Sequence, residues 1–154
     1  SIEIRAANGG VRAKTGSGSI KAYGVSGPFT SSSGSGSVEL EQVGPGDVEV
    51  DTGSGSIEVN GVRGALSADT GSGGIRAEGS MDGEWDLHSS SGTVVVRLPS
   101  DAQFQLDAKS SSGSIESDHP VTVHGLTKKH LQGDVRGGGA VLRIRTSSGS
   151  IRIK

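Results

Sequence analysis

Cysteine is absent from the 154-residue chain, and aromatic residues make up only 3% of it. Without cysteine the chain has no disulfide scaffold, no thiolate metal site and no cysteine nucleophile. Hydrophobic residues amount to 31%, and no apolar run approaches the roughly 18 residues that a membrane-spanning helix needs. Glycine, by contrast, occupies 27 positions. This composition is typical of disordered segments unless a repeat imposes order.

A repeat of 18 or 19 residues runs through most of the chain. Seven segments share one motif, in which a Gly/Ser-rich stretch ends at a β-branched residue, as in TGSGSIEV from Thr52. The β-branched positions are Ile20, Val38, Ile57, Ile75, Val94, Ile115 and Ile151. They are separated by 18, 19, 18, 19, 21 and 36 residues, and we interpret the last interval as two periods that enclose one degenerate copy. A fixed period of this kind predicts a solenoid, in which successive copies stack on one another.

Each copy contains two short stretches of alternating polarity. In Gly46–Arg63, the stretches VEVDT and IEVN flank a Gly-Ser-Gly break. Alternation with a period of two predicts strands with one buried face, and the break predicts a corner whose backbone angles suit glycine. The corner glycine recurs two residues before each β-branched position, at Gly18, Gly36, Gly55, Gly73, Gly92, Gly113 and Gly149. We therefore predict an all-β fold, a single-stranded parallel β-helix (β-solenoid) with 18–19 residues per coil, about eight coils and no significant helix.

The repeat predicts a single β-solenoid domain over residues 1–154. Because SIEIRA at the start matches the tail of a copy, we expect a fragment that begins in the middle of a coil. Residues 116–140 match the repeat poorly and are expected to form a degenerate or capping coil, with Val121 and Val123 in its first strand. The first and last strands, SIEIR and SIRIK, would leave unpaired strand edges at the two ends of the stack.

The succession of TGSGSI coils that leads into SGSIESDHPVTVHG and GGGAVLRIRTSSGSIRI resembles the bacterial adhesin-type domains of unknown function, a family of Gly/Ser-rich β-solenoids. The resemblance covers nearly the whole chain, and residues 112–153 are its most specific part. It implies a parallel β-helix and an extracytoplasmic setting, in the cell envelope, on the surface or secreted. It implies no catalytic residue, because the family has no catalytic motif to carry over.

Acidic residues are concentrated in the middle of the chain. Residues 39–86 hold eleven acidic and two basic residues, and stacking one coil apart places Asp51 beside Asp69. Such oxygen ligands suit hard divalent cations. His119 and His124 lie close together in the sequence, but their spacing matches no familiar zinc pattern. These four residues are the ones to examine for a metal, although their pattern predicts no defined metal site.

Basic residues are concentrated near the C-terminus. Where other copies carry Gly-Ser, the degenerate copy carries a basic tip, and further arginines follow, so the candidate anion-binding residues are Lys128, Lys129, His130, Arg136, Arg143 and Arg145. We expect them to attract anionic surface polymers or lipid head groups. A cap that only adds solubility is the alternative.

Enzyme motifs are absent from the sequence, which has no phosphate loop, no nucleophile elbow and no helix-borne histidine pair. We predict a non-enzymatic adhesin-like or scaffold module of a bacterial cell envelope or surface, with no cofactor, no nucleic-acid partner and no transmembrane segment. The expected partners are envelope polymers, lipid head groups or another protein. One alternative is a self-assembling structural subunit, a homo-oligomer that stacks through the solenoid ends. Another is a carbohydrate-acting enzyme, because polysaccharide-cleaving enzymes also use β-helices.

Overall fold

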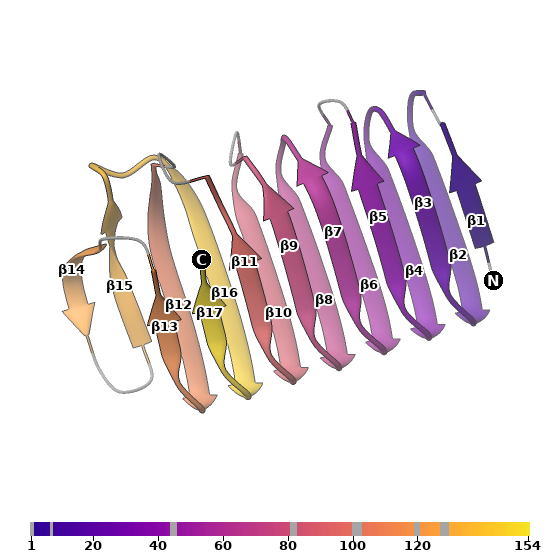
Figure 1. Ribbon diagram of the computed structural model, residues 1–154. Coiled ribbons are helices and arrows are strands. Elements are labelled where there is room, and N and C mark those ends of the chain that lie inside the picture. The colour runs from indigo at the N-terminus through magenta and orange to yellow at the C-terminus, as the bar shows by residue number, and fades with distance from the viewer. Residues whose placement is uncertain are drawn as a thin grey trace.

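The computed structural model describes residues 2–6, 8–43, 46–80, 83–99, 103–118, 121–126 and 130–154. In these ranges the chain forms strands that make up two facing β-sheets, and most consecutive strands lie in opposite sheets (Figure 1). The ranges contain no helix, and therefore none that is long and apolar enough to cross a membrane. The prediction of an all-β parallel solenoid is confirmed.

One sheet has eight strands, all parallel. In spatial order they are β1 (Ile2–Arg5), β3 (Ile20–Val25), β5 (Val38–Gln42), β7 (Ile57–Val62), β9 (Ile75–Gly79), β11 (Val94–Arg97), β17 (Ile151–Ile153) and β13 (Ile115–Ser117). The β-branched residues of successive copies pair directly, as Ile57 does with Ile75. The repeat period therefore corresponds to one coil of the stack.

The facing sheet has nine strands. In spatial order they are β2 (Val11–Ser17), β4 (Phe29–Ser35), β6 (Val48–Ser54), β8 (Leu66–Ser72), β10 (Trp85–Ser91), β16 (Ala140–Ser148), β12 (Phe104–Ser112), β15 (His130–Val135) and β14 (Val121–Leu126). All pairs from β2 to β12 are parallel, and β15 is antiparallel to both of its neighbours.

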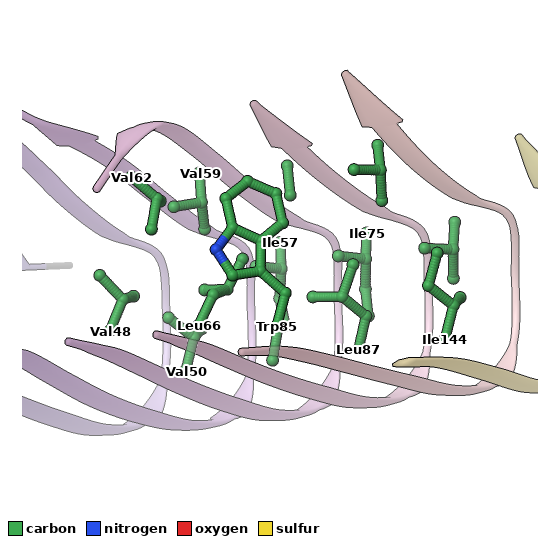
Figure 2. Packing of buried hydrophobic residues seen from close by; sticks show 14 of the residues in the cluster. Val48, Val50, Ile57, Val59, Val62, Leu66, Ile75, Trp85, Leu87 and Ile144 are labelled. Carbon is green, nitrogen blue, oxygen red and sulfur yellow. The ribbon is translucent and has the colours of Figure 1, made fainter. Parts of the chain in front are cut away.

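The core is a thin layer of aliphatic side chains between the two sheets (Figure 2). In the coil of β6 and β7, the alternating residues Val48, Val50, Ile57 and Val59 are each at most 2% exposed, as the sequence pattern predicts. Trp85 is the largest side chain buried in this layer, is fully buried, and donates a hydrogen bond from Nε1 to the Gly64 carbonyl oxygen at 3.0 Å. Each coil thus covers the apolar face of its neighbours.

The predicted glycine corners connect the nine-stranded sheet to the eight-stranded one. All seven corner glycines have φ between +113° and +133°, a region that side chains rarely enter. A β-carbon on Gly55 would also overlap the carbonyl oxygen of Gly36 in the preceding coil. The corner therefore requires glycine for its backbone angle and for the close approach of neighbouring coils.

A column of Thr and Ser hydroxyls holds these corners together from the inside. Thr52, for example, is 1% exposed and donates to the carbonyl oxygens of Gly36 and Ser54 at 3.1 and 3.2 Å. The same pair of contacts is made by Ser33, Thr70, Ser89, Ser110 and Thr146. Each hydroxyl thus supplies a donor to the corner glycine carbonyl of a neighbouring coil and a second donor to a serine carbonyl that also accepts a backbone N–H, as Ser54 does from Gly36.

The order of the last coils differs from our prediction. The C-terminal strands β16 and β17 lie inside the stack, between the coil of β10 and β11 and the coil of β12 and β13 (Figure 1). Ile151 consequently pairs with Val94 on one side and with Ile115 on the other. Our interpretation of the 36-residue interval as two stacked periods is wrong, because Ile115 and Ile151 are direct neighbours.

Residues 116–140, which we expected to form a degenerate or capping coil, contain an antiparallel hairpin instead of a coil. Its strands β14 and β15 extend the nine-stranded sheet beyond β12, while the eight-stranded sheet ends at β13. Val135 of β15 is fully buried against the core. The far end of the stack is therefore formed by β13 and this hairpin, and our expectation that the C-terminal strand forms it is wrong.

Candidate binding surfaces

The two carboxylates considered for a metal do lie side by side. Asp51 and Asp69 are partners in the pairing of β6 with β8, on the outer face of the nine-stranded sheet. Asp69 Oδ1 lies 3.1 Å from Nδ1 of His88 on the next strand. His119 lies outside the described residues, and His124 belongs to β14. Among the described residues, no group of three or more potential ligands is arranged to hold a metal ion.

The candidate anion-binding residues lie at several different places. Lys128 and Lys129 are outside the described residues. Arg136 follows β15, at the opposite end of that strand from His130, and is exposed with a φ of +51°. The six residues of a strand span about 17 Å. The predicted basic tip therefore does not include Arg136.

Arg143 and Arg145 both belong to the inserted strand β16, but their surroundings differ. Arg143 lies between Asp86 and Asp107 of the two neighbouring strands. Arg145 lies between His88 and Lys109. Carboxylates thus flank the first arginine and basic residues flank the second.

Four basic side chains form one continuous row across the outer face of the nine-stranded sheet. In the order of the strands they are His88 on β10, Arg145 on β16, Lys109 on β12 and His130 on β15, and we call them the basic row. His88 is held by Asp69, and His130 Nε2 lies 2.6 Å from Oδ1 of Asp107. Arg145 and Lys109 are exposed, and neither makes an ion pair within the described part of the chain.

The sequence could not reveal this row. His88 and Lys109 are 21 residues apart, and they would be neighbours if the coils were stacked in the order of the chain. The insertion of β16 places Arg145 between them, 36 residues beyond Lys109. The signal that was available is the basic character of the segment LRIR, which we assigned to the wrong end of the stack.

Acidic residues contribute to a raised pKa at one neighbouring side chain, Tyr23. Glu39 and Glu58 are paired on the outer face of the eight-stranded sheet, and Glu39 also lies next to Tyr23. Desolvation raises the pKa of Tyr23 above its usual value of 10.0, and the hydrogen bond that its hydroxyl donates to Glu39 and the negative charges of Glu39, Glu3 and Glu41 raise it further. The pKa of this tyrosine therefore depends on its desolvation first and on the neighbouring glutamates second.

A family model described as Toastrack DUF4097 matches residues 1–154, which is the whole chain. The chain belongs to the Toastrack family. This family is a domain of unknown function, and its name is consistent with a stack of parallel β-coils. No curated protein and no solved structure matches the Toastrack domain described above. Its function must therefore be argued from its own surfaces.

Proposed function

We propose that this Toastrack domain is a non-enzymatic scaffold or adhesin-like module of a bacterial cell envelope or surface, which works outside the cytoplasm. In this proposal the basic row holds a phosphate-bearing component of the envelope. The observation that supports it is the pairing of Arg145 with Lys109 on a flat outer face, with basic residues on either side.

The electrostatics of the basic row favour an external anion. Arg145 and Lys109 occupy directly paired positions on parallel strands, and neighbouring strands are about 4.8 Å apart. Like charges in paired positions are unfavourable. Two carboxylates beside the basic row, Asp69 and Asp107, already contact its two histidines. A phosphate group between Arg145 and Lys109 would remove their repulsion and accept charge-assisted hydrogen bonds from both.

Binding to anionic vesicles tests the proposal. We expect the protein to cosediment with vesicles of phosphatidylcholine and phosphatidylglycerol, and Arg145→Gln and Lys109→Gln each to weaken binding about fivefold, since a basic residue near such a surface contributes about 1 kcal/mol. Lys14→Gln is the matched control, because Lys14 occupies the same outward position on β2, next to Ser32. Equal binding by all three variants would contradict the proposed role of the basic row.

Two further measurements separate the remaining alternatives. Soluble polyphosphate should displace the protein from vesicles if any phosphate polymer is sufficient, whereas a requirement for the lipid surface would leave binding unchanged. Protease accessibility on intact producing cells tests the extracytoplasmic location. Release of reducing sugar from envelope polysaccharides would show a carbohydrate-acting enzyme and would refute the non-enzymatic role.

A further inference from the structure

A groove crosses the outer face of the eight-stranded sheet, on the opposite side of the molecule from the basic row. It consists of two adjoining hollows of about 370 and about 250 Å³, which share Thr93 and Val95 as lining residues. The lining residues belong to β7, β9, β11, β17 and β13 or to the turns just before them. These strands are consecutive in the sheet (Figure 1), so the groove follows the stacking direction. A site with this orientation fits an extended chain better than a compact small molecule.

One wall of the groove has a symmetrical order of charges. The outward residues of the five consecutive strands are Glu58, Arg76, Val95, Arg152 and Glu116. Arg76 and Arg152 are separated by two strand spacings, which is about 10 Å. Between them lies Val95, where the neighbouring coils carry charged residues. The centre of the groove is therefore positive with an apolar floor, and both of its ends are negative.

Both arginines keep hydrogen-bond donors available at the centre. Arg76 is exposed and makes no ion pair with the described residues, although Glu58 is its partner on β7. Arg152 uses Nη2 to contact Oε2 of Glu116 at 3.1 Å and is 53% exposed. A guanidinium group has five N–H donors in a fork that suits a carboxylate, so this contact leaves donors free.

The other wall of the groove is lined by hydroxyl groups, except at one position that has no side chain. Residues immediately before the β-branched positions are Ser56, Gly74, Thr93, Ser150 and Ser114. Gly74 stands where the other four coils carry Ser or Thr, so no side chain occupies the groove at that position. Hydroxyl groups both donate and accept hydrogen bonds, which suits a ligand that is itself rich in hydroxyls.

We propose that this groove binds a polysaccharide of mostly neutral sugars at one carboxylated sugar, whose carboxylate lies over Val95 between Arg76 and Arg152. The neutral sugars on either side pass Glu58 and Glu116 and contact the hydroxyl wall. A chain with a charge on every sugar would place carboxylates beside these glutamates, where like charges repel. The charge order thus selects sparsely charged chains. Arg152 belongs to β17 and Ser150 immediately precedes that strand, so the inserted C-terminal coil completes the site.

Calorimetric titration with four defined probes tests this inference. The probes are a pentasaccharide of neutral hexoses with one central glucuronate, the same pentasaccharide with a central glucose, a galacturonate pentamer, and the blocked peptide Ser-Gly-Glu-Gly-Ser. We expect the first probe to bind most tightly, and Arg76→Gln and Arg152→Gln each to weaken it about tenfold, as expected for loss of a charge-assisted hydrogen bond. In amide NMR spectra, Thr93, Val95 and Ser150 should shift.

Lys21→Gln is the matched control, because Lys21 occupies the same outward row on β3, outside the groove, between Glu3 and Glu39. This variant should bind the first probe like the parent protein. The inference is overturned if the galacturonate pentamer or the peptide binds as tightly as the first probe. It is also overturned if Lys21→Gln weakens binding as much as the two groove variants do. Because these residues are not in the basic row, the outcome is independent of vesicle binding.

Discussion

Alanine substitutions at four glycines separate the two reasons why the corners of the stack contain glycine. Gly55 combines a φ of +130° with a β-carbon position that overlaps the carbonyl oxygen of Gly36. Gly53 shows a similar overlap, with the carbonyl oxygen of Gly34, but no positive φ. Gly137 has a φ of +90° and open space, and Gly16 has open space without a positive φ. Gly55 thus combines backbone strain with steric overlap, whereas Gly53 shows the overlap alone. Gly137 shows the strain alone, and Gly16 shows neither.

The expected losses of stability follow from these geometries. At Gly55 the backbone strain costs about 1–3 kcal/mol, and displacement of the Gly36 oxygen breaks the hydrogen bond from Thr52, which costs about 1 kcal/mol more. We therefore expect Gly55→Ala to lower the free energy of unfolding by about 2–4 kcal/mol. Gly137→Ala should cost about 1–2 kcal/mol, and Gly53→Ala about 1–3 kcal/mol, because its β-carbon overlaps the Gly34 carbonyl oxygen.

Urea denaturation followed by tryptophan fluorescence measures these differences. Trp85 is the single tryptophan of the chain and is fully buried, so its emission changes when the stack opens. In a domain of this size each kcal/mol lowers the melting temperature by about 2–4 °C, which thermal scans confirm independently. Gly16→Ala is expected to leave stability unchanged or raise it by up to about 1 kcal/mol. If Gly55→Ala were as stable as Gly16→Ala, our account of the corner would be refuted.

Three other predictions concern the hydroxyl column, the inserted coil and the acidic face. Thr70→Val should lower the free energy of unfolding by about 1–3 kcal/mol in urea denaturation, because the Gly55 carbonyl loses the hydroxyl donor and the Ser72 carbonyl keeps only its backbone N–H, whereas Thr70→Ser should lose much less. Ile144→Ala should cost about 2–5 kcal/mol by the same method, because this residue of β16 is fully buried; a smaller loss than for the half-buried Ile4→Ala would contradict the inserted position. Ultraviolet titration of Tyr23, the single tyrosine, should give a midpoint above 10.0, and Glu39→Gln should lower it. A tyrosine whose pKa is raised on folding stabilises the fold below its unfolded pKa, and this contribution disappears as pH rises through the folded value.

The repeat carried enough information to predict the coils. Alternation in segments such as VEVDT predicted which side chains are buried, and the recurring glycine predicted where the chain turns. Both signals are local, because a strand and a corner are determined by residues a few positions apart. The order of the coils is not local. The segments that form β12 and β16 have the same pattern, so the sequence alone does not show which of them stacks on β10.

The candidate sites depended on that missing information. Lys109 and Arg145 are recognisable as basic residues, but only the insertion of β16 makes them neighbours. The groove could not be predicted, because neither Val95 nor Gly74 is unusual by itself. Each matters because the neighbouring coils carry a different kind of residue at the same position, charged residues beside Val95 and Ser or Thr beside Gly74. Such departures become visible once the register of each strand is known.

The insertion of β16 and β17 also has a consequence for the order in which the chain folds during synthesis. The coils from β2 to β11 pair with counterparts made 18 to 19 residues earlier, so they can stack as they emerge. On its other side, Trp85 of β10 pairs with Leu142, which is synthesised 57 residues later. Strand β12 cannot reach its final place until β16 has been made. Such distant pairing slows folding. Until it is complete, β10 and β11 present an open edge of unpaired backbone groups, which is a template for pairing with other chains.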